Sequence, residues 1–133
     1  MKTFIDTNIF LDLLLKRTYY KEALEILNYC SNHKYKTYIL DITILNIDYI
    51  AKKQVKDLRE FLKLINENFI IIGGSNKLFD DALKMDNNDL EDNLQYYSAY
   101  KEKCDIIITN DKGFINKQIP LLTSSEFVEK FIK

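Results

Sequence analysis

The sequence predicts an α/β fold, a three-layer α/β/α sandwich built around a sheet of parallel strands. Short apolar stretches alternate with longer segments of helical pattern along the whole chain. Two of the apolar stretches, residues 69–72 and 105–109, carry runs of isoleucine without polar alternation, as expected for strands covered on both faces. The chain has 133 residues, the length of one domain, and we expect residues 1–133 to form a single one.

The elements follow in order from apolar runs and turn-forming residues. Five strands are predicted at Lys2 to Ile5, Thr37 to Leu40, Phe69 to Ile72, Asp105 to Thr109 and Pro120 to Thr123. Seven helices are predicted at Asn8 to Leu15, Tyr19 to Asn32, Thr43 to Lys53, Lys56 to Asn66, Asn76 to Lys84, Leu90 to Lys103 and Ser125 to Ile132. Gly73-Gly74-Ser75 has no Lys-Ser or Lys-Thr behind it, so it predicts a strand-to-helix turn and not a phosphate loop.

Composition narrows the class of protein. Hydrophobic residues make up 47% and charged residues 29%, and no apolar run approaches the roughly 20 residues that cross a membrane. Asp6 stands where the apolar core of a signal peptide would continue, so we expect a cytoplasmic protein. Cys30 and Cys104 lie far apart without histidine partners and are expected to be small buried hydrophobes. A net charge of -1 means that any affinity for nucleic acid must come from a local basic patch or from a metal ion.

Three aspartates are predicted to meet at one edge of the sheet. Asp6 ends the first strand immediately before a helix, which is where ligands gather in open α/β sheets. Asp92 and Asp111 fall where the same geometry brings them to that edge. Two carboxylates about 4 Å apart repel by roughly 4 kcal/mol at an effective dielectric near 20. Because all three ligands are hard oxygens, the sequence predicts a site for Mg²⁺ or Mn²⁺.

The segment around Asp92 has a purely structural alternative. Asp89 is a natural helix N-cap, and Asp92 stands in the first turn, where a carboxylate is stabilised by free backbone N–H groups. On a helical wheel the buried arc contains Leu90, Leu94, Tyr97 and Tyr100, and the solvent side contains Glu91, Gln95 and Ser98. Asp92 falls at the margin of the buried arc, where it is placed to enter a cleft. Asp111 has its own alternative, since Asn, Asp and Gly after a strand also form simple turns.

The combination of motifs resembles a known family. Asp6-Thr7-Asn8, the run Asp-Asn-Leu-Gln-Tyr-Tyr-Ser-Ala from Asp92 and the run Thr-Asn-Asp-Lys-Gly-Phe from Thr109 resemble the acidic motifs of PIN domains in order, interval and total length. The chain is most similar to the small bacterial branch with VapC-like toxins, in which a Leu-rich helix follows Asp-Thr-Asn. The resemblance implies a metal-dependent ribonuclease on a five-stranded parallel sheet, the toxin of a toxin-antitoxin pair with an antitoxin partner, and a homodimer.

One position departs from the pattern of many PIN nucleases. They carry a glutamate on the helix after the second strand, where this chain has Asn46, as some branches of the family also do. Asp48 cannot replace a glutamate at position 46, because residues two positions apart on a helix are separated by about 200° of rotation. Asn46 would offer a neutral oxygen to the cavity, so we expect a site that binds metal with less charge.

These residues predict hydrolysis of a phosphodiester by a metal-activated water, and the resemblance to PIN domains implies that the phosphodiester is that of RNA. Asp6, Asp92 and Asp111 would hold the ion, with Asn46 completing the cavity. Residues expected to orient the carboxylates or the water are Thr7, Asn8 and Thr109, of which Thr7 and Asn8 equally suit a helix cap. His33, the only histidine, lies in a polar stretch and is expected to be a surface turn residue.

Contacts with the RNA backbone are expected from Lys16, Arg17 and Lys53, and stacking of unpaired bases from tyrosines such as Tyr19, Tyr20 and Tyr49. Two other functions stay open. A non-catalytic PIN-like module that binds RNA or a partner protein is favoured by Asn46. A phosphatase with Asp6 as nucleophile ranks third, because Asn8 stands where such sites use a second aspartate.

Overall fold

The computed structural model describes residues 1–32, 36–111, 113–114 and 118–133. His33 therefore lies outside the described residues. The strands are β1 (Lys2–Ile5), β2 (Lys36–Leu40), β3 (Ile70–Ile72), β4 (Ile106–Ile108) and β5 (Leu121–Leu122). The helices are α1 (Thr7–Leu14), α2 (Tyr20–Asn32), α3 (Asp41–Ala51), α4 (Leu58–Asn68), α5 (Asn76–Leu83), α6 (Leu90–Lys101), α7 (Ser124–Phe127) and a π-helical segment η1 (Val128–Ile132).

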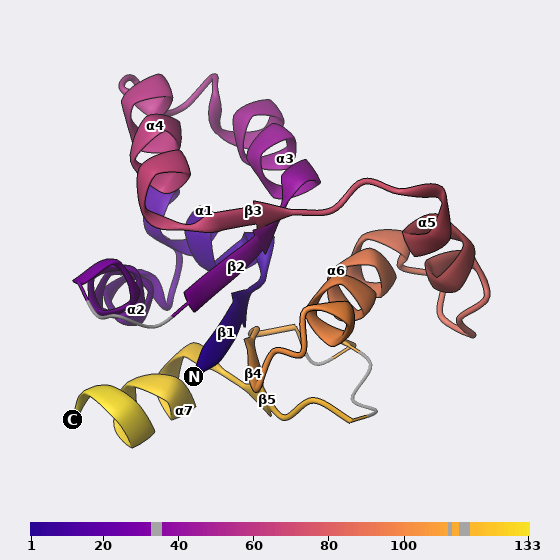
Figure 1. The fold of residues 1–133 in the computed structure, drawn as a ribbon. Helices are drawn as coiled ribbons and strands as arrows, with labels where there is room; N and C mark the ends of the chain where they lie inside the picture. Colours follow the sequence, from indigo (N-terminus) through magenta and orange to yellow (C-terminus); the bar gives the residue numbers. More distant parts are fainter. Residues whose placement is uncertain (33–35, 112, 115–117) are drawn as a thin grey trace.

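The strands form one parallel sheet in the order β3-β2-β1-β4-β5 (Figure 1). The predicted five-stranded parallel sheet is thus confirmed. β1 lies in the centre, with Phe4 paired to Tyr38 of β2 and to Ile107 of β4. Because β1 and β4 are neighbours and run in the same direction, the residues that follow them meet at the carboxyl edge of the sheet.

Helices cover both faces of the sheet, which confirms the three layers (Figure 1). Successive strand residues point to opposite faces. Ile5 packs with the apolar residues of α1, α2, α3, α4 and α7, while Phe4 packs with those of α5 and α6. Both residues are fully buried, so the central strand holds the two cores together.

The edges of the sheet differ from expectation. The run at 69–72 was interpreted as a strand covered on both faces, but Ile70 is 41% exposed and Ile71 is 37% exposed. The physical reason is that β3 is an edge strand, with a neighbour on one side only. The predicted last helix, 125–132, consists of a short α-helix that begins at Ser124 and continues as a π-helix.

Two smaller predictions are confirmed. Cys30 and Cys104 are both free and buried. Gly73 and Gly74 form a turn with φ of 142° and 60°, and Ser75 caps α5 by accepting a hydrogen bond from the backbone N–H of Leu78 at 3.2 Å. Among the described residues, no helix is both long enough and apolar enough to cross a membrane.

Candidate metal centre

Asp6 is a buried carboxylate at the end of β1, held by two neutral donors. Gln95 Nε2 donates to Asp6 Oδ1 at 2.9 Å, and Thr109 Oγ1 donates to Asp6 Oδ2 at 2.8 Å. Burial raises the pKa of Asp6 to about 6, although both hydrogen bonds act in the opposite direction. Asp6 is therefore fixed in orientation by groups that do not neutralise its charge.

A second group of carboxylates forms the core of the site. Asp89, Asp92 and Asp111 each present one oxygen, and these three oxygens lie within 4.8 Å of one another. Asp92 is buried, Asp111 is half-buried and Asp89 is exposed. We call these three residues the acidic cluster. The structure thus brings together the predicted pair Asp92 and Asp111, and it adds Asp89.

Asp6 acts on the acidic cluster through its charge. Burial raises the pKa of Asp92 to about 8, and the causes that follow are the hydrogen bond with Asp111 and repulsion by Asp89, Asp111 and Asp6. Asp6 lies outside the group of oxygens within 4.8 Å but near enough to disfavour the charged form of Asp92. A cation among these carboxylates would relieve the repulsion.

The residues around Asp6 link three elements. Thr109 Oγ1 also accepts a hydrogen bond from the backbone N–H of Asp111 at 3.0 Å, so one hydroxyl ties Asp6 to the loop after β4. Thr7 Oγ1 lies 2.8 Å from the hydroxyl of Thr43 at the start of α3. The side chain of Thr109 therefore contacts Asp6 directly, whereas that of Thr7 contacts Thr43, a residue that the sequence did not predict near the site.

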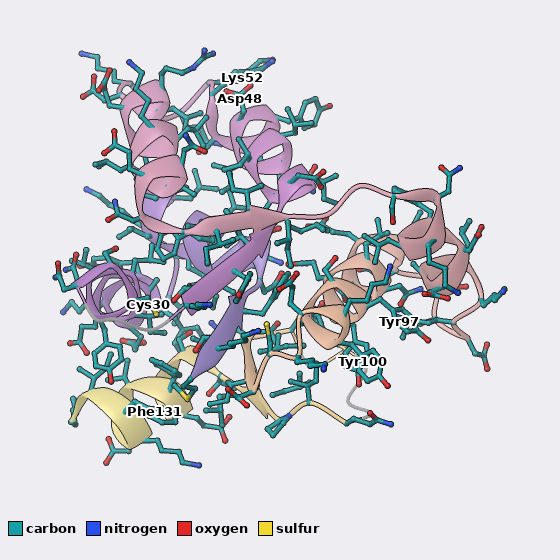
Figure 2. All side chains as sticks on the ribbon, in the orientation of Figure 1. Cys30, Asp48, Lys52, Tyr97, Tyr100 and Phe131 are labelled. Carbon is teal, nitrogen blue, oxygen red and sulfur yellow. The ribbon has the colours of Figure 1, made fainter. Side chains whose placement is uncertain are left out.

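Asn46 is half-buried on α3, three residues after Thr43 and so on the same side of the helix. Its side chain makes no hydrogen bond with any residue that the structure describes. Asp48 lies near the end of α3 that is farther from the sheet, as does Lys52, which follows the helix (Figure 2). The structure accordingly keeps Asn46, and not Asp48, on the side of α3 that faces Thr7.

Gln95 is the contact residue that the sequence misplaced. The helical wheel put Gln95 and Ser98 on the solvent side of α6, but they are only 1% and 3% exposed. Leu90 and Tyr100, assigned to the buried arc, are exposed. The reason is that α6 is covered by β2, by α5 and by the segment around Gln118, whose N–H donates to Tyr96 Oη, so the helix has more than one buried side. The sequence did contain one signal for Gln95: it stands three residues after Asp92, and residues at this spacing lie on the same side of a helix.

The basic residues predicted to contact RNA lie in different places. Arg17 follows α1, where Nη1 donates to Asn8 Oδ1 at 3.4 Å and lies 3.8 Å from Asp12 Oδ1. Lys16, beside it, has a left-handed backbone with φ of 50°. Lys53 follows α3, beyond the opposite end of that helix from Thr43. Arg17 is thus the one of the three with described side-chain contacts, and these are to Asn8 and Asp12 on α1.

The donor set suits a hard divalent cation. The acidic cluster offers carboxylate oxygens only, the ligand type of Mg²⁺, Mn²⁺ and Ca²⁺. Within the described ranges, the ion pairs involve Asp12, Glu60 and Asp81, and none involves Asp6 or the acidic cluster. No described Lys or Arg side chain therefore forms an ion pair with these four carboxylates, and the residues present fit a metal ion.

Comparisons with known proteins agree with this geometry. A model of the PIN domain matches residues 2–113. Ribonuclease VapC1 of Aquifex aeolicus (strain VF5) is 29% identical over 141 residues, covering 98% of this chain and 95% of the relative. A chain of VapBC2 from Rickettsia felis, bound to a DNA fragment from their promoter, superposes with a TM-score of 0.65 at 21% identity, covering 92% of this chain and 98% of that one. A chain of a toxin-antitoxin complex from Klebsiella pneumoniae superposes with a TM-score of 0.68 at 23% sequence identity, covering 92% of this chain and 97% of that one. At these identities the solved structures show a shared fold.

Proposed function

The chain belongs to the PIN domain family, and we propose that it is a single-domain ribonuclease that hydrolyses phosphodiester bonds of RNA with Mg²⁺ or Mn²⁺. The observation that carries the proposal is the acidic cluster at the carboxyl edge of the sheet, with buried Asp6 beside it and no described cation in contact. The name of its relative Ribonuclease VapC1 supports the assignment of RNA as substrate.

The proposed ligands are Asp6, Asp92 and Asp111, with Asp89 as a further donor. When bound, a divalent ion lowers the pKa of a water molecule and stabilises charge on the phosphate and on the leaving oxygen. The chain's own contribution is to fix the carboxylates. Gln95 and Thr109 hold the two oxygens of Asp6, and the backbone N–H of Asp92 is bound by Asp89 Oδ1 at 3.1 Å. Asn46 would offer a neutral oxygen to the same cavity.

We further propose that the protein is the toxin of a toxin-antitoxin pair, acts in the cytoplasm as a homodimer and is inhibited by an antitoxin protein. This rests on the solved toxin-antitoxin complexes with the same fold. Lys16, Arg17 and Lys53 are proposed to contact the phosphates of the RNA. Electrostatic contacts of this kind give affinity that falls as salt rises.

Asn46 favours a second candidate function, a PIN-like module that binds RNA or a partner without cleaving it. A neutral side chain in place of a glutamate removes one negative charge from the cavity, and a divalent ion would be held less tightly. The two functions separate cleanly in one assay, because only the first requires turnover.

The test is cleavage of a panel of structured RNAs by purified protein in Mg²⁺ or Mn²⁺, with EDTA and Asp6→Asn as controls. We expect metal-dependent cleavage that EDTA and Asp6→Asn abolish. If the wild-type protein cuts none of the RNAs in either metal and binds no Mn²⁺ by calorimetry, the ribonuclease proposal fails and the non-catalytic binding module replaces it.

A further inference from the structure

We propose that a cavity beside the acidic cluster is a subsite for one unpaired nucleotide, in which the ring of Tyr19 stacks on the base and Arg17 binds the phosphate. The inference rests on the proposed function, since the nucleotide belongs to the RNA strand at the metal centre. The cavity measures about 410 Å³ and is lined by Asn8, Asp12, Arg17, Thr18, Tyr19, Asn110 and Asp111. Its volume lies within the range of small-ligand sites.

The position of the cavity joins it to the metal centre. Asp111 belongs both to the acidic cluster and to the cavity wall. Asn8, which also lines the cavity, stands two residues after Asp6 at the start of α1. A nucleotide in the cavity would therefore neighbour the phosphate at the acidic cluster along the strand.

Tyr19 provides an aromatic face that packing leaves free. Its side chain is 44% exposed and forms no ring pair or hydrogen bond with the residues that the structure describes. In contrast, Tyr96, Tyr97 and Tyr100 stack or meet edge to face with one another. Exposed aromatic faces beside a cation are the usual platform for unpaired bases, because every base has a π-face.

The guanidinium group of Arg17 is held in place but keeps N–H donors that make no hydrogen bond to the described residues. Its side chain is 42% exposed, and the contacts to Asn8 and Asp12 both use Nη1. A guanidinium carries five N–H donors, so Nη2 and Nε remain to bind a phosphate with two hydrogen bonds. The carboxylate that holds it, Asp12, is itself buried and accepts from Asn110 Nδ2 at 3.2 Å. Asp12 therefore positions Arg17, and because Asp12 also lines the cavity, a bound phosphate would lie on the Nη2 and Nε side of Arg17, away from that carboxylate.

The backbone of the loop also fixes the geometry. The left-handed conformation of Lys16 turns the chain back, so that the N–H of Arg17 donates to the carbonyl of Asp12 at 2.9 Å. The N–H of Tyr20 donates in turn to the carbonyl of Arg17 at 3.1 Å. Arg17 and Tyr19 thus lie on a loop that is ordered by its own backbone hydrogen bonds. Such order lowers the conformational entropy that is lost when a ligand binds.

The experiment measures binding of a fluorescein-labelled single-stranded RNA of mixed sequence to the full chain in EDTA by anisotropy. The variants are Tyr19→Ala, Tyr19→Phe and Arg17→Gln. The matched controls are Phe79→Ala, which removes a ring that is 40% exposed on α5, and Lys63→Gln, which breaks a surface ion pair with Glu60. Thermal melts verify that each variant folds.

We expect Tyr19→Ala to weaken binding about 10-fold, with Tyr19→Phe near wild type because stacking needs only the ring. Arg17→Gln should reduce the salt slope of log K by about 0.7, the value for one phosphate contact on a single strand. The controls should change binding less than about twofold, as expected for side chains outside the subsite. Equal losses in Phe79→Ala and Tyr19→Ala, or no binding by the wild type, would overturn the subsite.

Cleavage in Mn²⁺ by the same proteins separates the two proposals. If the wild type cuts RNA and both Tyr19→Ala and Arg17→Gln keep its KM, the subsite is wrong and the ribonuclease stands. If the wild type cuts nothing while Tyr19→Ala and Arg17→Gln still weaken binding, the subsite stands and the catalytic proposal fails.

Discussion

At the scale of single residues, the site depends on how the buried carboxylate of Asp6 is oriented. Gln95 donates to Oδ1 of Asp6 through Nε2, and its Oε1 accepts from the backbone N–H of Thr7 at 3.3 Å. One amide therefore connects α6 to both the side chain and the backbone that follow β1. Groups that orient a metal ligand in this way affect affinity although they do not touch the ion.

We predict that Gln95→Leu lowers Mn²⁺ affinity and RNA cleavage by about 10- to 100-fold, the range for lost partners of metal ligands. The physical reason is that Asp6 would lose the donor to Oδ1. Calorimetry and initial rates measure the two effects. Ser98→Ala is the matched control, because Ser98 lies three residues further along α6 and its buried hydroxyl has no partner among the described residues. Gln95→Leu with wild-type Mn²⁺ affinity would refute this role.

The sequence located part of this site. Asp6 and Asp111 were predictable because they follow apolar runs that had to be strands, and the ends of parallel strands meet at one edge. Gln95 could not be predicted in this way, because a helical wheel assumes one buried side and α6 has more than one. Asp89 was predicted as the N-cap, which the structure confirms, but a cap residue gave no separate signal that its carboxylate also joins Asp92 and Asp111.

At the scale of elements, α6 combines helix capping with carboxylate clustering at its N-terminus. Asp89 Oδ1 accepts from the backbone N–H of Asp92, so one side chain stabilises the helix and adds charge to the cluster. Two substitutions separate these roles. Asparagine caps as well as aspartate does, whereas alanine does not.

We predict that Asp89→Ala lowers the free energy of unfolding by about 1 kcal/mol through loss of the cap, and that Asp89→Asn leaves it near wild type. Both variants should weaken Mn²⁺ binding to the same extent, because both remove the same charge. Thermal melts in EDTA and calorimetry with Mn²⁺ measure the two properties. Full Mn²⁺ affinity in Asp89→Asn would restrict Asp89 to capping.

The alternation of strands and helices was readable from the sequence, but the order of the strands was not. Isoleucine runs near 70 and near 107 look alike as local patterns. In the structure Ile107 is fully buried in β4 beside the central strand, whereas Ile70 lies at the edge. Position within a sheet depends on long-range pairing, which a local apolar run does not encode.

At the scale of the whole molecule, crowded carboxylates make metal-free stability depend on pH. Burial raises the pKa of Asp6 to about 6 and, together with neighbouring charges, that of Asp92 to about 8, from an ordinary value of 3.8. Between the ordinary and the raised values, the folded state holds protons that the unfolded chain has released. Stability is therefore lost as pH rises through this window.

We predict that the melting temperature in EDTA is at least about 3 °C higher at pH 5 than at pH 8, the shift that roughly 1 kcal/mol produces in a chain of this size. Saturating Mn²⁺ at pH 8 should raise the melting temperature again, because the ion binds the folded state only. Melts at the two pH values, with and without Mn²⁺, measure this. A higher melting temperature at pH 8 in EDTA would show that the carboxylates are not strained by their neighbours.

The metal-binding role that we propose for the acidic cluster is distinct from that of a helix N-terminus that is merely rich in carboxylates. It is tested most directly by calorimetric titration of Mn²⁺ into the wild type and into Asp92→Asn at neutral pH. Asparagine keeps the shape of the side chain and removes one charge. We expect saturable binding by the wild type and a loss of at least about tenfold in Asp92→Asn, consistent with removal of a ligand. Equal Mn²⁺ affinity in the two proteins, or no saturable binding by the wild type, would show that the acidic cluster is not a metal centre.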